Sequence, residues 1–161
     1  MTSTEPRAQR SSWATSDPEV ARDFIDRAYG AAHLRVRRPD DSDWTVRIGQ
    51  VRAAGFLLSA ADMPAEVDVR IGPRRDELLV TTIHSGRIAI ERGSGRPARY
   101  QAGDTFVSNA PDADWALRSQ QNRNLTITLS ERLMRDAARA AGGGANEAGD
   151  WRLLGHEPHP E

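Results

Sequence analysis

The sequence contains no cysteine among its 161 residues, and all 22 of its basic residues are arginine. Without cysteine the chain cannot form disulfides, thiolate metal sites or a thiol nucleophile. No apolar run approaches the roughly 20 residues that a membrane-spanning helix needs. The formal charge of −1 gives no general attraction to nucleic acid or anionic lipid. We therefore expect one cytoplasmic domain with no membrane partner.

Histidine is also scarce, which bears on metal binding. The four histidines are His33, His84, His156 and His159. No two of them form a His-x-His pair, and a buried cation needs several fixed donors that converge from different strands. One histidine with Asp112 or Asp114 would give too few ligands for a stable site. The sequence therefore predicts no metal and no other cofactor.

The motifs of common enzyme classes are missing as well. No Gly-x-Ser-x-Gly elbow occurs. The glycine-rich stretches at residues 93–96 and 142–144 lack the Lys and Ser/Thr of a phosphate-binding loop. We therefore expect that the chain is not an enzyme.

An amphipathic helix is predicted over residues 17–29. Ser16 is a suitable N-cap, and Glu19 completes a capping box three residues later. Pro18 falls in the first turn, where its missing N–H costs nothing. Residues 1–15, which precede this helix, are expected to form a flexible tail.

From residue 33 to residue 129 the hydrophobic period changes to two. Short alternating runs recur every eight to twelve residues, which is typical of an all-β sandwich or barrel of about nine strands. Gly103-Asp104 and Ser85-Gly86 are hairpin signals, and a phase change at Gly49 suggests a bulge. A closed or double-sheet barrel would hide the strand edges.

The chain returns to helix over residues 131–141, with Ser130 as the predicted cap. Its apolar stripe consists of Leu133, Met134, Ala137, Ala138 and Ala141. This stripe could pack on the chain's own barrel. Residues 143–161 are rich in Gly, Pro and polar side chains and read as a linker-like tail.

The stretches "LLVTTIHSGRIAIE", "YQAGDTFVSNAP" and "LTITLSERLM", together with the opening helix, carry a family resemblance. They resemble the N-terminal cupin-like sensor domain of AraC-family transcription regulators. "SDPEVARDFIDRAYG" is similar to the actinobacterial branch of that family. The resemblance spans residues 13–156 and implies a mainly β fold, a cupin-like double-stranded β-helix barrel between two helices, with the sensor domain over residues 16–142.

This resemblance also implies function and partners. A sensor domain of this kind binds a small-molecule effector and forms a homodimer, often through the helix after the barrel. The stripe of the closing helix would then be the dimer contact, as an alternative to packing on its own barrel. In the family a C-terminal helix-turn-helix domain binds DNA; we expect that this chain lacks it and that residues 143–161 lead toward it.

Candidate ligand-binding residues come from the strand regions. Trp44, Tyr100 and Trp115 could line a pocket, because small-molecule pockets are mostly apolar with a few polar groups. Thr82 and His84 alternate with Val80 on one predicted face. Ordinary core packing of the aromatic side chains, and a solvated histidine near a turn, remain the alternatives.

Two arginines, Arg47 and Arg70, could clamp an anionic ligand, or they could belong to a solvated strand face. The first hypothesis is therefore an effector-sensing and dimerising domain. The alternatives are a small cupin isomerase or oxygenase, and a stand-alone interaction domain whose barrel is filled by side chains.

Overall fold

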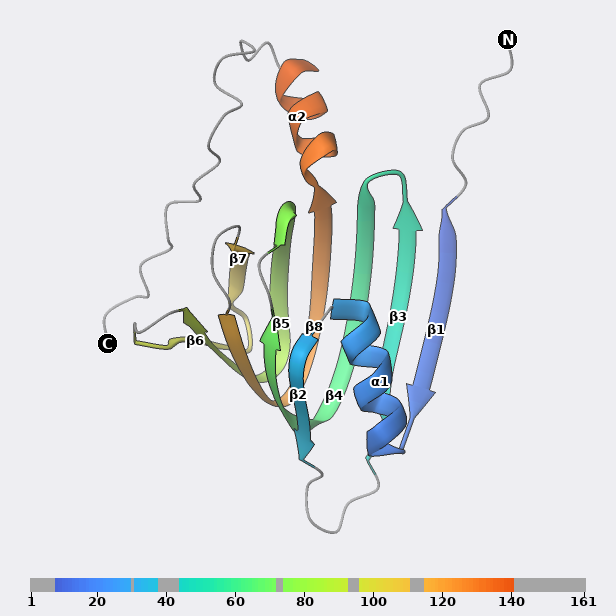
Figure 1. The fold of residues 1–161 in the computed structure, drawn as a ribbon, viewed down its shortest axis with the longest axis vertical. Coiled ribbons are helices and arrows are strands. Elements are labelled where there is room, and N and C mark those ends of the chain that lie inside the picture. The colour runs from blue at the N-terminus through green and yellow to red at the C-terminus, as the bar shows by residue number, and fades with distance from the viewer. Residues whose placement is uncertain are drawn as a thin grey trace.

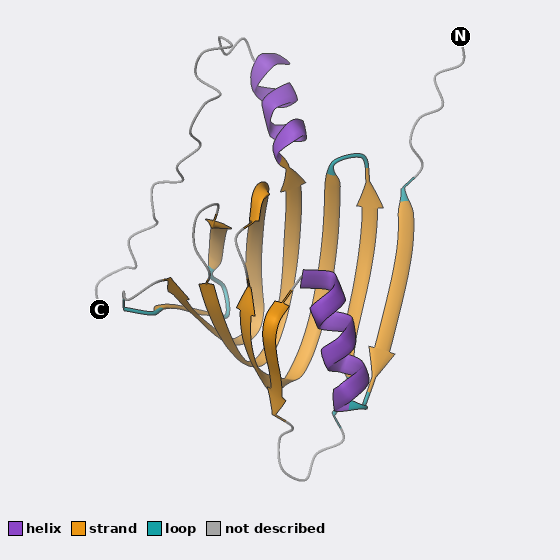
Figure 2. Ribbon diagram, viewed as in Figure 1, coloured by secondary structure: helices purple, strands orange, loops and turns teal. Residues whose placement is uncertain are grey.

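Eight antiparallel strands form one sheet, and two helices accompany it (Figures 1 and 2). The computed structural model describes residues 8–29, 31–37, 44–71, 74–92, 96–110 and 115–140. The elements in chain order are β1 (Gln9–Thr15), α1 (Pro18–Tyr29), β2 (Ala31–Arg37), β3 (Val46–Ala53), β4 (Phe56–Ile71), β5 (Arg74–Arg92), β6 (Ala98–Gln101), β7 (Thr105–Ala110), β8 (Trp115–Ser130) and α2 (Glu131–Ala140). This confirms the mainly β, cupin-like fold with two helices, although the strand β1 precedes the first helix.

Three long strands, β4, β5 and β8, run through both layers of the fold. Along β4, residues 56–62 pair with β3 and residues 66–71 pair with β2. Along β5, residues 74–82 pair with β7 and residues 87–90 pair with β6. Because β8 pairs with β4 and β5 along its whole length, it lies at the centre of both layers. The sheet thus bends back over itself, as Figure 1 shows where the lower ends of these strands curve.

The bend follows a line of irregular backbone positions. The β4–β8 register shifts between Met63 and Glu66, and the β5–β8 register shifts on both sides of Ser85. Gly86 has φ of 80° and Gln121 has φ of 45°. The predicted hairpin at Ser85-Gly86 is therefore wrong, because the positive φ of this glycine makes a bulge within a continuous strand and does not reverse the chain.

The turn at Gly103 is confirmed, whereas the bulge expected at Gly49 is not. Gly103 has φ of 96° and donates its N–H to the carbonyl of Ile83 at 2.9 Å. Across Gly49, β3 stays in continuous register with both β1 and β4. The apparent phase change there reflects a half-buried stretch of β3 and no extra residue.

The expected flexible tail over residues 1–15 is wrong for Gln9–Thr15, which forms the edge strand β1 and pairs with β3. Most of its side chains are exposed, so the segment lacks the alternation by which strands are recognised in a sequence. Trp13 and Thr15 are half-buried, and the ring of Trp13 stacks on Phe24 of α1 with centroids 4.2 Å apart. Residues 1–7 lie outside the part that the structure describes.

Helix α1 begins one residue later than predicted, and its cap is different. Asp17 Oδ1 accepts hydrogen bonds from the backbone N–H groups of Glu19 at 2.9 Å and Val20 at 3.4 Å. Asp17 is therefore the N-cap, while Ser16 Oγ pairs with Thr45 Oγ1 at 3.0 Å. The capping box assigned to Ser16 was wrong because two adjacent residues both have capping side chains.

Helix α2 follows β8 directly and projects from the end of the sheet (Figure 1). Ser130 caps it as predicted, since its Oγ accepts from the N–H of Leu133 at 3.2 Å. The N–H of Ser130 also donates to the carbonyl of Gly55 in the β3–β4 turn at 2.9 Å. None of the residues of α2 is buried. Ala141 and residues 143–161 lie outside the described residues.

The buried side chains form two clusters. One lies where α1 packs on the sheet, and it includes Ala21, Ile25, Trp44 and Val46. The second lies within the bent half of the sheet and includes Phe106. Among the described helices, none has the length and apolar content to cross a bilayer.

Candidate functional site

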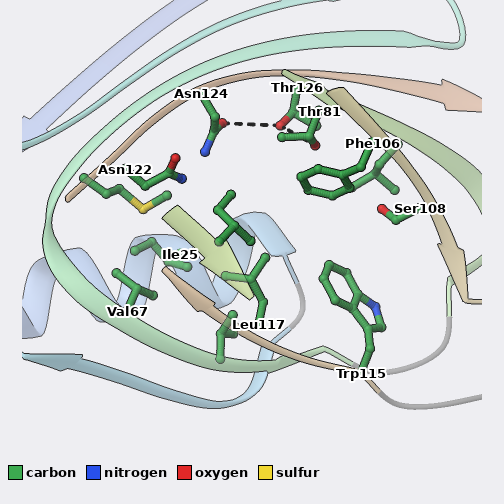
Figure 3. A pocket seen from close by; sticks show the side chains of 14 residues that line it. Ile25, Val67, Thr81, Phe106, Ser108, Trp115, Leu117, Asn122, Asn124 and Thr126 are labelled. Atoms are coloured by element: carbon green, nitrogen blue, oxygen red, sulfur yellow. Dashed lines mark hydrogen bonds between the residues drawn. The ribbon is translucent and has the colours of Figure 1, made fainter. Parts of the chain in front are cut away.

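A cavity of about 70 Å³ lies between the two layers of the bent sheet (Figure 3). Since one water molecule needs roughly 10–15 Å³ on this measure, the cavity has room for several waters or a small ligand. The described residues that line it are Ile25, Met63, Val67, Val69, Leu79, Thr81, Ile88, Phe106, Ser108, Trp115, Leu117, Asn122, Asn124 and Thr126.

One side of the cavity is polar. Asn122, Asn124 and Thr126 come from the second half of β8, and Thr81 comes from the adjacent β5. Thr126 Oγ1 lies 3.1 Å from Thr81 Oγ1 and donates to Asn124 Oδ1 at 3.4 Å. Figure 3 shows this chain of hydrogen bonds on one side, with the nitrogen of Asn124 turned toward the cavity. Ser108 of β7 adds another buried hydroxyl.

Asn122 differs from the other polar residues of the cavity. Its side chain is only 1% exposed, and its Oδ1 has no hydrogen-bond partner. A buried acceptor without a partner costs about 1–3 kcal/mol. Such a group in a cavity wall is a place where a ligand donor would restore the missing hydrogen bond.

The facing side of the cavity is apolar. It is made by Trp115 and Leu117 from the first half of β8 and by Val67 from β4 (Figure 3). Phe106 of β7 is paired with Thr81 and lies next to the polar side, where its aromatic ring stacks on Tyr100 with centroids 4.4 Å apart. The cavity thus has one side that hydrogen-bonds and one side that packs against hydrocarbon.

Among the described side chains of α1, Ile25 lines the cavity and is 3% exposed. Ala21, which lies about one turn before Ile25 on the same face of the helix, is fully buried. Because Phe24 also stacks on Trp13 of β1, the helix is fixed to the sheet from two directions. The N-terminal helix therefore closes part of the cavity as well as covering the core.

The polar residues of the cavity were not predicted from the sequence, and strand phase explains why. On β8 the inward side chains are Trp115, Leu117 and Ser119 before the bend and Asn122, Asn124 and Thr126 after it. The irregular residue Gln121, with its positive φ, moves the alternation by one position. In the second half the apolar members of "NLTITL" are only half-buried, on the outer face. The glutamine pair before Asn122 was the only available signal of this change.

The structure places the predicted ligand-binding residues in different surroundings. Trp115 lines the cavity. Tyr100 does not line it but lies behind Phe106, on which it stacks. Trp44 is 2% exposed and does not line the cavity, but it packs in the cluster under α1 that also contains the lining residues Ile25, Met63 and Val67. Whether any of these residues contacts a ligand stays a prediction.

Thr82 and His84 point away from the cavity, so the predicted phase of β5 is wrong. The neighbouring residues Thr81 and Ile83 are the buried ones. Thr82 Oγ1 lies 2.9 Å from Thr105 Oγ1 near the surface, and His84 is exposed. Because this part of β5 has apolar and polar residues on both faces, its sequence alone does not show which face is buried.

The side-chain groups at the cavity do not match the metal ligands known from cupins. The described lining residues offer amide and hydroxyl groups but no histidine or carboxylate. Within the described ranges, no three His, Asp or Glu side chains come together as potential metal ligands. Asp112, Asp114, His156 and His159 fall outside those ranges, and the side chain of His33 is not described.

These features define a cupin-like β sandwich with an internal, partly polar cavity. Residues 21–149 match the family model of the AraC-binding-like domain. The chain therefore belongs to the AraC-binding-like domain family. No curated protein matches the chain in a sequence search.

One solved structure supports the fold. The AraC-like transcriptional activator CuxR is similar with a TM-score of 0.62 and 17% identity, over 84% of this chain and 52% of CuxR. This chain thus spans about half the length of CuxR. Lower similarity is found to the cupin domain of Schizosaccharomyces pombe Cnp3, with a TM-score of 0.44 and 13% identity over 68% of this chain and 76% of that one. An RmlC-like cupin from Shewanella frigidimarina has a TM-score of 0.41 and 15% identity over 61% and 84% of the two chains.

Proposed function

We propose that this chain is the effector-sensing domain of an AraC-type transcription regulator, and that a small molecule binds in the cavity between the two layers. The observation that carries the proposal is Asn122, a buried amide in the cavity wall whose oxygen has no partner. A ligand would supply the missing hydrogen bond and fill the space beside the apolar side. Membership of the AraC-binding-like family supports a regulatory role for such binding.

Strand β8 offers a direct path from the cavity to the rest of a regulator. Asn122 and Asn124 lie on β8, and the same strand continues into α2 through Ser130. A ligand that contacts β8 can shift the position of α2 only if it binds one arrangement more tightly than another. We place the regulatory output at α2 for this reason.

Dimerisation through α2 is part of the proposal. The apolar stripe of this helix includes Leu133, Met134, Ala137 and Ala138, and none of these side chains is buried in the single chain. Leu133 is 37% exposed although it is large and apolar. A second copy of the helix would cover the stripe, and the small alanine side chains would allow a close approach. The seam would join two copies in the cytoplasm, with DNA bound by a separate domain of the regulator.

Binding without chemistry is the other part of the proposal. The described side chains around the cavity end in hydrocarbon, thioether, hydroxyl, amide or indole groups, which suit binding more than acid–base or nucleophilic catalysis. The presence of a cavity also favours a sensor over an interaction domain with a filled interior. The actinobacterial origin remains a prediction from the sequence.

A thermal-shift screen of small metabolites tests this function. A ligand that binds only the folded chain stabilises it by about 2.7 kcal/mol when present at 100 times its Kd. We expect saturable stabilisation by at least one compound, which is then recovered chemically unchanged after denaturation. Conversion of the bound compound into a product would identify an enzyme and contradict the proposal.

A further inference from the structure

The charged groups of the described chain lie away from the cavity. None of the fourteen described lining residues carries an ionisable side chain. Arg47 and Arg70, which the sequence offered as anion clamps, are exposed. The cross-strand pairs Arg118–Asp68 at 3.5 Å and Arg123–Asp62 at 3.1 Å also lie on the outer surface of the sheet. Among the described residues, the charged groups therefore lie on the outer faces and the cavity lining is neutral.

The neutral described lining selects against charged ligands. Transfer of a carboxylate, phosphate or ammonium group from water into this cavity would remove most of its hydration. No described lining side chain would provide the opposite charge, and the hydroxyl and amide groups compensate only in part. Binding of an ion would thus be weaker than binding of an uncharged molecule of the same shape.

The polar side of the cavity specifies which neutral group fits. Asn124 uses its oxygen to accept from Thr126, which leaves its NH2 group to donate into the cavity. Asn122 Oδ1 is an acceptor without a partner. The two amides are two residues apart on one strand face, which corresponds to about 7 Å. A ligand group that both accepts and donates, such as a hydroxyl or an amide, can lie between them and satisfy both.

The apolar side specifies the rest of the ligand. Trp115, Leu117 and Val67 face the two amides across the cavity and offer hydrocarbon and aromatic surface, apart from the indole N–H of Trp115 (Figure 3). We infer that the effector is a small, uncharged molecule with an apolar body and one hydroxyl or amide group, which sits between Asn122 and Asn124. This inference rests on the proposed function, because it names the chemical class of ligand for the same cavity.

Two pairs of compounds with identical heavy-atom skeletons test the inference. Isobutyramide is compared with isobutyrate, and isobutanol with the isobutylammonium ion, so that each pair differs mainly in charge. Binding to the full chain is followed by NMR, from the side-chain NH2 signals of Asn122 and Asn124 and the methyl signals of Val67 and Leu117. We expect the neutral member of each pair to bind more than about tenfold more tightly, because a charge loses its hydration in the cavity.

Two variants at one position provide controls that report ligand polarity. Asn122→Leu should weaken binding of isobutyramide more than binding of a purely apolar probe, cyclopentane, so that the preference for the amide is lost. Asn122→Asp should reverse the second pair, so that isobutylammonium binds more tightly than isobutanol. If Asn122→Asp does not fold, Asn122→Leu alone still decides whether this amide selects the ligand.

The outcomes separate this inference from the proposed function. Tighter binding of isobutyrate or isobutylammonium to the wild-type cavity would overturn the inference and leave a sensor with a charged effector. Failure of all four compounds to shift the cavity signals would also overturn it, for ligands of this size. In that case the thermal-shift screen still decides independently whether the chain binds a small molecule.

Discussion

At the scale of single residues, an unpartnered polar group in the cavity wall lowers the stability of the fold. Asn122 is almost completely buried, and its oxygen has no partner, although a leucine of similar size would remove the penalty. Functional sites commonly keep such unfavourable groups, and their replacement stabilises the protein at the expense of activity. Asn124 differs, because its oxygen accepts a hydrogen bond from Thr126.

The first prediction follows from this difference. Asn122→Leu should raise the free energy of unfolding by about 1 kcal/mol, because an unsatisfied buried acceptor is removed. The same variant should lose the stabilisation that a ligand gives to the wild-type chain. Urea unfolding followed by tryptophan fluorescence measures both effects.

Asn124→Leu is the matched control. It should gain less stability than Asn122→Leu, since Thr126 then loses an acceptor. A loss of stability in Asn122→Leu would mean that this amide has a structural partner in solution, and it would contradict its role as the group kept free for a ligand.

Residue-level features show the limit of sequence reasoning most clearly. Trp115 was predicted to line a pocket and does so, because strand alternation before the bend is regular. Asn122, Asn124 and Thr126 could not be predicted, since the backbone at Gln121 changes the phase of β8. A prediction that places apolar residues inside assigns the wrong face to the second half of that strand, because its inner face is the polar one.

At the scale of the elements, helices and tight turns were predictable and the long bent strands were not. Capping residues, helical stripes and Gly103 are local signals, and they located α1, α2 and the β6–β7 turn to within about a residue or two. Gly86 is also a local signal, but a glycine with positive φ is compatible with either a turn or a bulge. Because β5 pairs with β8 on both sides of Gly86, this glycine forms a bulge. Such long-range pairing cannot be predicted from the sequence of one segment.

The second prediction concerns this bend. A Cβ atom at Gly86 would lie 2.3 Å from the carbonyl oxygen of Gln121, and the residue has φ of +80°. Gly86→Ala should therefore destabilise the fold by on the order of 3 kcal/mol, from conformational strain together with a backbone clash. Thermal unfolding followed by circular dichroism measures the loss.

Gly49→Ala provides the comparison for this bend. Nothing lies within 4 Å of a Cβ at Gly49, so the change should leave stability unaffected or raise it by about 0.5 kcal/mol. Equal effects of the two substitutions would show that the bulge at Gly86 does not hold the two layers together.

The third prediction concerns α2. Ala137 is exposed on the apolar stripe, so Ala137→Glu should leave the unfolding free energy of the single chain within about 0.5 kcal/mol of wild type. It should nevertheless shift a dimer toward monomer, because a charge would be buried in the seam. Sedimentation velocity over a concentration series measures this shift.

Arg139→Glu serves as the control for α2. Arg139 lies on the opposite face of the helix, where it pairs with Asp136 at 3.1 Å, and its side chain is 67% exposed. This charge change should not alter the oligomeric state. Dissociation by both variants, or by neither, would contradict a dimer seam along the alanine stripe.

At the scale of the whole molecule, one sheet encloses a cavity whose two sides differ in chemistry. The first halves of β4 and β5 and the second half of β8 form one layer with β1, β3 and β7, and the remaining halves form the other layer with β2 and β6. Because β8 crosses from the apolar side to the polar side and then continues into α2, one strand joins the cavity to the proposed dimer helix. The chain belongs to a family of AraC-binding-like domains, and this arrangement suits a sensor.

Native mass spectrometry of the purified chain tests this account most directly. It reports oligomeric state and bound small molecules in one experiment, and wild type is compared with Asn122→Leu. The account predicts a homodimer that carries a small uncharged organic molecule on the wild-type chain and loses it in the variant. A monomer that carries one transition-metal ion would contradict the account and would favour a cupin enzyme.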